Sequence, residues 1–243
     1  MSAPLPLLGR FHEFSVAVAD VRAALEFYER LGFTQAITTD AFAHAYGALT
    51  DGHLVVGLHG RSGPSPILTF VRPGVAGTVA AYAAAGIGLA SCRTGEERFN
   101  ELGFEDPDGQ AVAVLEARTY SPVSRAGREP SLCGDFAAVS LPAADFARAR
   151  EFWERLGFVA ADEEDAPYPH LPLTSDFLDV SFHRPRLIDR PMLVFSDPQM
   201  PARLARLRER GIEVAPAPRG LAAGAGLLEG PDGTPLLLLS EAR

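Results

Sequence analysis

The chain contains the same segment twice, and this repeat limits the folds that it can adopt. Residues 20–33 read DVRAALEFYERLGF and residues 145–158 read DFARAREFWERLGF, with nine of the 14 positions identical. The second copy begins 125 residues after the first (145 − 20). A Pro-Asp-Gly tripeptide also occurs in each half, at residues 107–109 and, 124 residues later, at residues 231–233. Two separate motifs that return at nearly one spacing indicate a duplicated unit.

The segment that joins the two copies has the composition of a linker. It runs from about Arg118 to Pro130, is polar, contains two Pro and one Gly, and shows no apolar periodicity. We therefore expect a first domain over residues 1–118, a linker over residues 119–130 and a second domain over residues 131–243. Each domain then has an ordinary size for an independent unit.

Charge and composition exclude several classes of function. The 243 residues carry 31 Asp and Glu against 22 basic residues, a net charge of -9, and this argues against a nucleic-acid partner, whose phosphates need a basic face. No apolar run approaches the roughly 20 residues of a membrane span, and residues 1–10 lack the pattern of a secretory signal. We expect a cytoplasmic protein without membrane contact. No GxGxxG, P-loop, GxSxG or HExxH motif is present, so the chemistries of those motifs are unsupported.

Each half reads as a strand, a helix and then several strands. Phe14, Val16 and Val18 alternate with small or polar residues, as in a half-buried strand, and Asp20 is placed to cap the helix that follows. The predicted strands are 42–48, 53–59, 67–71, 112–115, 136–141 and 236–239, and the predicted helices are 21–31, 75–85 and 146–156. This pattern predicts an α+β protein with four βαβββ units in two pairs.

The order and spacing of these elements resemble the glyoxalase, bleomycin-resistance and extradiol-dioxygenase proteins, the vicinal oxygen chelate superfamily. The resemblance is carried by the helix ends FYERLGF and FWERLGF and by the late turns at residues 106–109 and 230–233, and it spans essentially the whole chain. It implies that each pair of units curls into an incompletely closed, eight-stranded barrel around a cleft. It also implies either a monomer, in which the halves pair as subunits do in other members, or a homodimer.

Metal-using members of that superfamily hold Mn, Fe, Ni or Zn in the cleft through His and Glu side chains of the strands. The eight corresponding positions of this chain hold Glu13, Ala138, Ala113, Leu237, Pro66, Pro191, Gly57 and Ser181. Only Glu13 is a good ligand, whereas such metals need three or four nitrogen or oxygen ligands at fixed geometry. The resemblance therefore implies that the usual metal site is absent from both clefts, and we expect no metal and no other cofactor. A divalent metal is the alternative.

Polar residues at equivalent places in the two halves are the candidates for contacting a ligand. His59 and His183 lie 124 residues apart, and His44 with Tyr46 corresponds to Tyr168 with His170 at the same offset. Members of each pair point to one side of a strand, where they either bind a ligand or are satisfied by solvent and backbone. The candidate ligand-binding residues are Glu13, Ser15, His44, Tyr46, His59, Ser140, Tyr168, His170, Ser181 and His183.

Two functions fit these observations. The first is a metal-free protein that binds a small molecule, such as an antibiotic or an aromatic metabolite, as bleomycin-resistance proteins do. The second is a lyase, isomerase or dioxygenase that uses Glu13 or His59 in catalysis, with or without a metal. The sequence leaves open which ligand is bound and whether one or both clefts are used.

Overall fold

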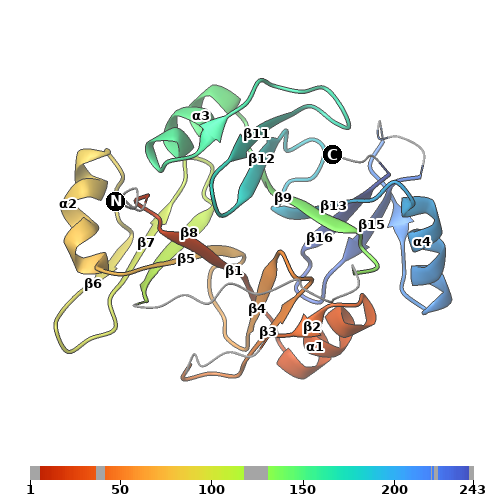
Figure 1. Ribbon diagram of the computed structural model, residues 1–243, viewed down its shortest axis with the longest axis horizontal. Coiled ribbons are helices and arrows are strands. Elements are labelled where there is room, and N and C mark those ends of the chain that lie inside the picture. The colour runs from red at the N-terminus through yellow and green to blue at the C-terminus, as the bar shows by residue number, and fades with distance from the viewer. Residues whose placement is uncertain (1–5, 37–41, 118–130, 220, 222–223, 241–243) are drawn as a thin grey trace.

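The computed structural model describes residues 6–36, 42–117, 131–219, 221 and 224–240, in which the chain forms two eight-stranded mixed sheets. Figure 1 shows the two sheets side by side, with helix α2 at the outer edge of the first and helix α4 at the outer edge of the second. Both sheets are curved, and neither closes into a barrel. The predicted linker, residues 119–130, lies outside the described residues.

The first sheet contains the elements of the first half. Its strand order is β2-β3-β4-β1-β5-β8-β7-β6, with β1 parallel to β4, β5 parallel to β8, and β1 antiparallel to β5. Two βαβββ units therefore meet at the β1–β5 pair. The elements are β1 (Arg10–Ala17), α1 (Val21–Arg30), β2 (Thr34–Gln35), β3 (Tyr46–Thr50), β4 (Val55–His59), β5 (Ile67–Arg72), the 3-10 helix η1 (Val75–Thr78), α2 (Val79–Ala84), β6 (Ser91–Arg93), β7 (Glu101–Glu105) and β8 (Ala111–Glu116).

The second sheet repeats this topology. Its order is β10-β11-β12-β9-β13-β16-β15-β14, with the same parallel and antiparallel pairs. The elements are β9 (Asp135–Pro142), α3 (Phe146–Arg155), β10 (Val159–Ala160), β11 (His170–Thr174), β12 (Asp179–His183), β13 (Met192–Ser196), α4 (Met200–Glu209), β14 (Ala215–Pro216), β15 (Gly226–Glu229) and β16 (Pro235–Leu239). The α+β class and the four βαβββ units predicted from the sequence are confirmed.

The strand predicted over residues 42–48 is shorter and later than expected, because β3 begins at Tyr46. Its pairing with β4 begins at the Tyr46–His59 pair. The preceding Phe42 instead folds back on these two side chains, with ring centroids 4.4 Å from Tyr46 and 5.0 Å from His59. Beyond the strand pair, the two segments are still joined by one backbone hydrogen bond, from the Gly60 N–H to the Ala45 carbonyl at 2.8 Å.

The repeated helices begin and pack as the sequence predicts. Asp20 caps α1 by accepting a hydrogen bond from the Ala23 backbone N–H, and Asp145 caps α3 in the same way through the N–H groups of residues 147 and 148. Tyr28 and Trp153, at matching places on the two helices, are both fully buried. These side chains belong to the core, as their helical spacing indicates.

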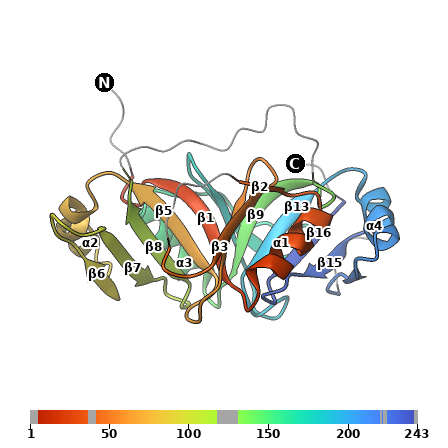
Figure 2. The same cartoon turned by 90° about the horizontal axis from the view of Figure 1, so that it is seen from below.

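Each repeated helix contacts the opposite half of the molecule. Trp153 of α3 donates a hydrogen bond from Nε1 to Asp106 Oδ2 of the first half, at 3.2 Å. In the mirrored place, the Tyr28 hydroxyl of α1 approaches Gly230 in the second half, and Figure 2 shows α1 beside β13 and β16. One cluster of buried apolar side chains runs through both halves. The two halves therefore pair within the chain.

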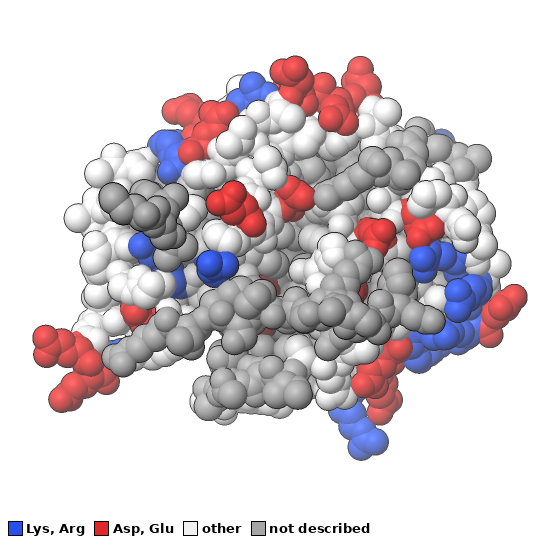
Figure 3. Space-filling view, viewed as in Figure 1, with Lys and Arg blue, Asp and Glu red and all other residues white. Residues whose placement is uncertain are grey.

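The face of the molecule shown in Figure 3 has no large basic patch. Arg side chains lie toward its edges, and acidic side chains are distributed over several elements. Among the described residues, no helix has the length and apolar character needed to cross a bilayer.

Candidate functional site

In the first half, Glu13 lies at the centre of a buried group of polar side chains. Ser15 donates to Glu13 Oε1 at 2.7 Å, Tyr46 donates to Oε2 at 2.6 Å, and His59 Nε2 lies 2.8 Å from Oε1. Ser15 and Thr69 also share a hydrogen bond at 2.7 Å. Strand alternation places Glu13 and Ser15 on one side of β1, as predicted. Both carboxylate oxygens are therefore occupied by hydrogen bonds from the protein itself.

These contacts keep the Glu13 carboxylate ionised despite its 1% exposure. Burial raises the pKa of Glu13, but hydrogen bonds from His59, Tyr46 and Ser15 favour the charged form, and the net shift of the pKa is downward. His59 Nδ1 in turn lies 2.9 Å from His44 Nε2. A hydrogen-bonded chain thus leads from a buried carboxylate through one imidazole to a second, partly exposed one.

Gly57 gives the Glu13 side chain its place. Gly57 lies on β4 opposite Ser15 of β1, and a Cβ atom on Gly57 would overlap the Glu13 carboxylate. In the second half the two residue sizes are exchanged, because Ala138 replaces Glu13 and Ser181 replaces Gly57. The space that the glutamate fills in one half is therefore left open in the other.

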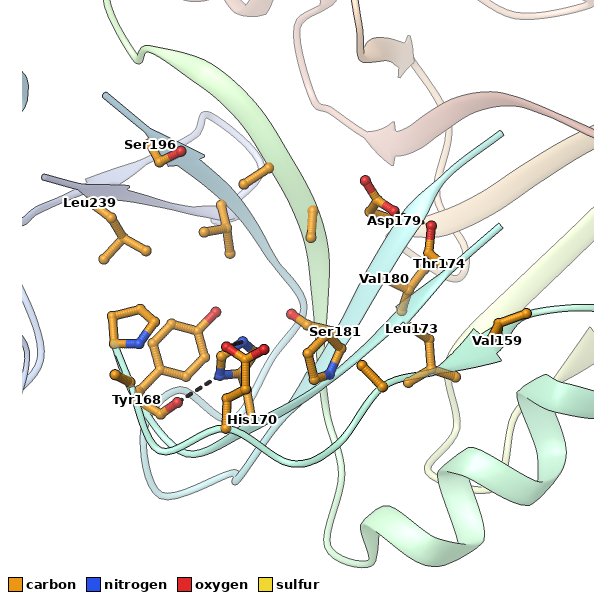
Figure 4. A pocket seen from close by; sticks show the side chains of 18 residues that line it. Val159, Tyr168, His170, Leu173, Thr174, Asp179, Val180, Ser181, Ser196 and Leu239 are labelled. Carbon is orange, nitrogen blue, oxygen red and sulfur yellow. Dashed lines mark hydrogen bonds and ion pairs between the residues drawn. The ribbon is translucent and has the colours of Figure 1, made fainter. Parts of the chain in front are cut away.

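The second half has a cavity of about 650 Å³ at this place, partly open to solvent. Figure 4 shows Tyr168, His170 and Ser181 on one side of it and Ser196 and Leu239 on the other. Most of the lining is apolar: Ala137, Ala138, Val159, Ala161, Ala166, Pro167, Pro172, Leu173, Val180, Val194 and Leu239. We call this cavity the second-half cleft. Its volume and its mainly apolar walls are those of a small-molecule site.

A second polar network joins β9 and β12. Ser140 Oγ is 2.8 Å from His183 Nδ1, and His183 Nε2 is 2.8 Å from the backbone carbonyl oxygen of Ile188. Burial lowers the pKa of His183 to about 4, so this imidazole is neutral at pH 7. His183 has no solvent exposure, and His59 has only 4%. Both ring nitrogens of each of these two side chains have a hydrogen-bond partner.

The structure gathers the ten candidate residues into two groups, one in each half. The first group consists of Glu13, Ser15, His44, Tyr46 and His59. In the second group Tyr168, His170 and Ser181 line the second-half cleft, and Ser140 and His183 are joined by a hydrogen bond outside that lining. Sequence reasoning missed Thr69, which bonds to Ser15, and Phe42, which covers the first group. In the sequence, only the aromatic side chain of Phe42, two residues before His44, hinted that Phe42 belongs to this group.

The strand register shows which residues lie opposite Glu13 and Ala138. Pro66 and Pro191 are not the residues opposite the first-strand positions. Antiparallel pairing of β1 with β5 places Thr69 opposite Glu13, and the equivalent pairing places Val194 opposite Ala138. The proline positions lie outside the strands, because each strand begins only after its proline.

Comparison with solved structures identifies the fold. A crystal structure of catechol 2,3-dioxygenase superposes with a TM-score of 0.60 at 14% identity, over 96% of this chain and 88% of that one. The 2,3-dioxygenase LapB from Pseudomonas sp. KL28 gives a TM-score of 0.63 at 15% identity, over 97% and 92%. Homoprotocatechuate 2,3-dioxygenase from Arthrobacter globiformis gives 0.60 at 19%, over 98% and 81%. These extradiol dioxygenases are vicinal oxygen chelate proteins.

The chain has the vicinal oxygen chelate fold. No protein-family model and no curated protein matches the sequence. At identities below one fifth, the likeness establishes the fold and leaves activity to be argued from the site.

The residues at the metal positions of the vicinal oxygen chelate fold do not fit a metal in this chain. In the second half, Ala138, Val194 and Leu237 stand in register on adjacent strands and offer no donor atom. In the first half, Glu13, Thr69 and Ala113 stand in register, and the oxygens of Glu13 already accept three hydrogen bonds. Among the described residues, no group of three or more His, Cys, Asp or Glu is arranged to hold a metal ion.

Proposed function

We propose that the second-half cleft binds a small aromatic molecule without a metal. The observation that carries this proposal is the cavity of about 650 Å³, which is bounded by Ala138 and Val194 where metal-using members of the fold place ligands. Burial of an aromatic ring against these apolar side chains is favourable by about 25 cal/mol per Å² of apolar surface removed from water. The polar groups of Tyr168 and Ser181 at one wall supply orientation.

An aromatic metabolite is the ligand that the comparisons favour over an antibiotic. The similar structures are named as enzymes acting on catechol and homoprotocatechuate, and a single aromatic ring fits easily within the cavity volume. Sequestration of an antibiotic in the manner of bleomycin-resistance proteins is the other form of the proposal.

A melting experiment on chelator-treated protein tests the binding function. Substituted phenols and anilines at concentrations near 100 Kd should raise the melting temperature by about 5 °C or more with no metal added. An Ala138→Phe variant, in which the new ring fills the cleft, should lose the response. The matched control is Ala81→Phe, which adds the same ring on an exposed face of α2 and should retain it. Binding that requires added metal, or that survives Ala138→Phe, contradicts the proposal.

One observation favours a second function, proton transfer in the first half. With Glu13 ionised, His59 Nε2 donates to it, His59 Nδ1 accepts from His44 Nε2, and His44 Nδ1 is left to accept a proton. Burial, His59 and Arg61 lower the pKa of His44, which keeps it in the neutral form that acts as a base. A turnover that is lost in Glu13→Gln but retained in Ala138→Phe would assign catalysis to the first half. Equal loss in both variants would exclude this function.

A further inference from the structure

Two hydrogen-bond acceptors lie close together in the lining of the second-half cleft. His170 Nδ1 is 2.8 Å from the backbone carbonyl oxygen of Tyr168, and a carbonyl can only accept, so Nδ1 carries a proton. In the neutral ring, His170 Nε2 is then an acceptor. Glu164 Oε2 lies 3.9 Å from this nitrogen. That distance is too long for a direct hydrogen bond, but a group with two or more N–H donors can reach both atoms from between them.

The backbone brings these two acceptors together. Glu164 and His170 form an antiparallel pair in which the N–H of each residue donates to the carbonyl of the other at 2.8 Å. The His170 ring also packs on the Tyr168 ring, with centroids 5.0 Å apart, and Figure 4 shows the two rings next to each other. The paired backbone therefore sets the spacing of the acceptors before a ligand binds, which lowers the entropic cost of binding.

The charged side chains of the cleft lining are acidic. Glu164 and Asp179 both line the cleft. No Arg is among the described residues of the lining, and the chain contains no Lys. The neighbours of Glu164 in the sequence, Asp162, Glu163 and Asp165, are exposed carboxylates. These charges favour a cationic ligand group and oppose a carboxylate.

We propose that the second-half cleft selects aromatic molecules that carry a protonated amine, with the ammonium group held between His170 Nε2 and Glu164 Oε2. This inference rests on the proposed function, in which the aromatic ring lies against the apolar walls. An ammonium group has three N–H donors and can donate to both acceptors at once. Its charge also strengthens both hydrogen bonds. An alcohol of the same shape has one O–H donor and no charge, so it can donate to only one of them.

Calorimetric titration of the full chain tests the selection. The probes are 2-phenylethylamine, 2-phenylethanol and 3-phenylpropionate at about pH 7.5, where the alkylamine is protonated. Because the Glu164 side chain is 58% exposed, solvent screens its charge, and we expect the amine to bind about 10-fold more tightly than the alcohol. The carboxylate should bind most weakly. Equal affinity for the amine and the alcohol, or tightest binding of the carboxylate, overturns the inference and leaves the proposed function intact. Binding of none overturns both.

Three variants locate the source of the preference for the amine. Glu164→Gln removes the charge, and the preference should fall below about 3-fold through weaker binding of the amine alone. His170→Phe removes the second acceptor, keeps an aromatic ring and should act in the same direction. Glu163→Gln is the matched control, since it makes the same change at an exposed position outside the cleft lining, and it should keep the preference. An unchanged preference in Glu164→Gln, or an equal fall in Glu163→Gln, overturns the assignment.

Discussion

The first half has Gly57 where the second half has Ser181, and the neighbouring side chain accounts for this difference. Gly57 leaves room for the Glu13 carboxylate, whereas Ser181 stands beside Ala138. We predict that Gly57→Ser lowers the free energy of unfolding by about 2 kcal/mol, because its Cβ overlaps the carboxylate. The same change made in Glu13→Ala should cost less, with a coupling energy of about 1 kcal/mol or more in a double-mutant cycle measured by urea denaturation. Additive effects would contradict the steric account.

His183 gives the stability of the protein a pH dependence. Its folded-state pKa of about 4 lies below the ordinary 6.5 because of burial, so the unfolded chain binds the proton more readily as pH falls through this window. Stability from this group is fully present above pH 6.5 and is lost toward pH 4. Between pH 7 and pH 5 the unfolding free energy should fall by about 2 kcal/mol more in the native protein than in His183→Gln. Equal losses in urea titrations would show that His183 titrates normally.

Sequence reasoning placed individual side chains correctly where strand alternation alone decides. It assigned Glu13 and Ser15 to one face of β1, and the structure joins them by a hydrogen bond. It could not predict how His183 is paired, because the partner of His183 Nε2 is the backbone carbonyl of Ile188 in a following loop. Thr69 was missed for a similar reason, since its position opposite Glu13 is set by the register between strands that are distant in sequence.

The repeated helices α1 and α3 make contacts of different quality with the opposite half. Trp153 Nε1 donates to buried Asp106, whereas the Tyr28 hydroxyl has no hydrogen-bond partner among the described residues. We predict that Trp153→Phe lowers the unfolding free energy by about 2 kcal/mol or more, because it removes ring volume and a partner of Asp106. Tyr28→Phe should change it by less than about 1 kcal/mol. Denaturant unfolding of the two variants measures the difference, and equal losses would contradict this account.

The types and order of the elements were largely predictable from periodicity and turn residues, but several boundaries were not, among them the starts of β3 and β4 and the 3-10 start of the helix at Val75–Thr78. Asp20 and Gly32 mark the ends of the first helix region, and the structure places α1 between them. The start of β3 was predicted too early: Phe42 lies outside the strand, and its ring packs on Tyr46 and His59. Such packing depends on contacts between two strands and leaves no local periodicity in the sequence.

At the scale of the molecule, the halves share one apolar core. We therefore predict a single cooperative unfolding transition, with far- and near-ultraviolet circular dichroism giving the same midpoint. The boundaries at residues 118 and 131 remain our proposal for where the two structural domains meet. Two separated transitions would show that the halves unfold independently and that their contact contributes little.

The most direct test of the account is a crystal structure of chelator-treated protein grown with 4-bromophenol, in which the bromine is located by anomalous scattering. The account predicts a bromine peak inside the second-half cleft, against Ala138 and Val194, with the phenol hydroxyl directed to Tyr168 and Ser181. A metal ion held by side chains in either half, or bromine found only outside this cleft, would contradict it.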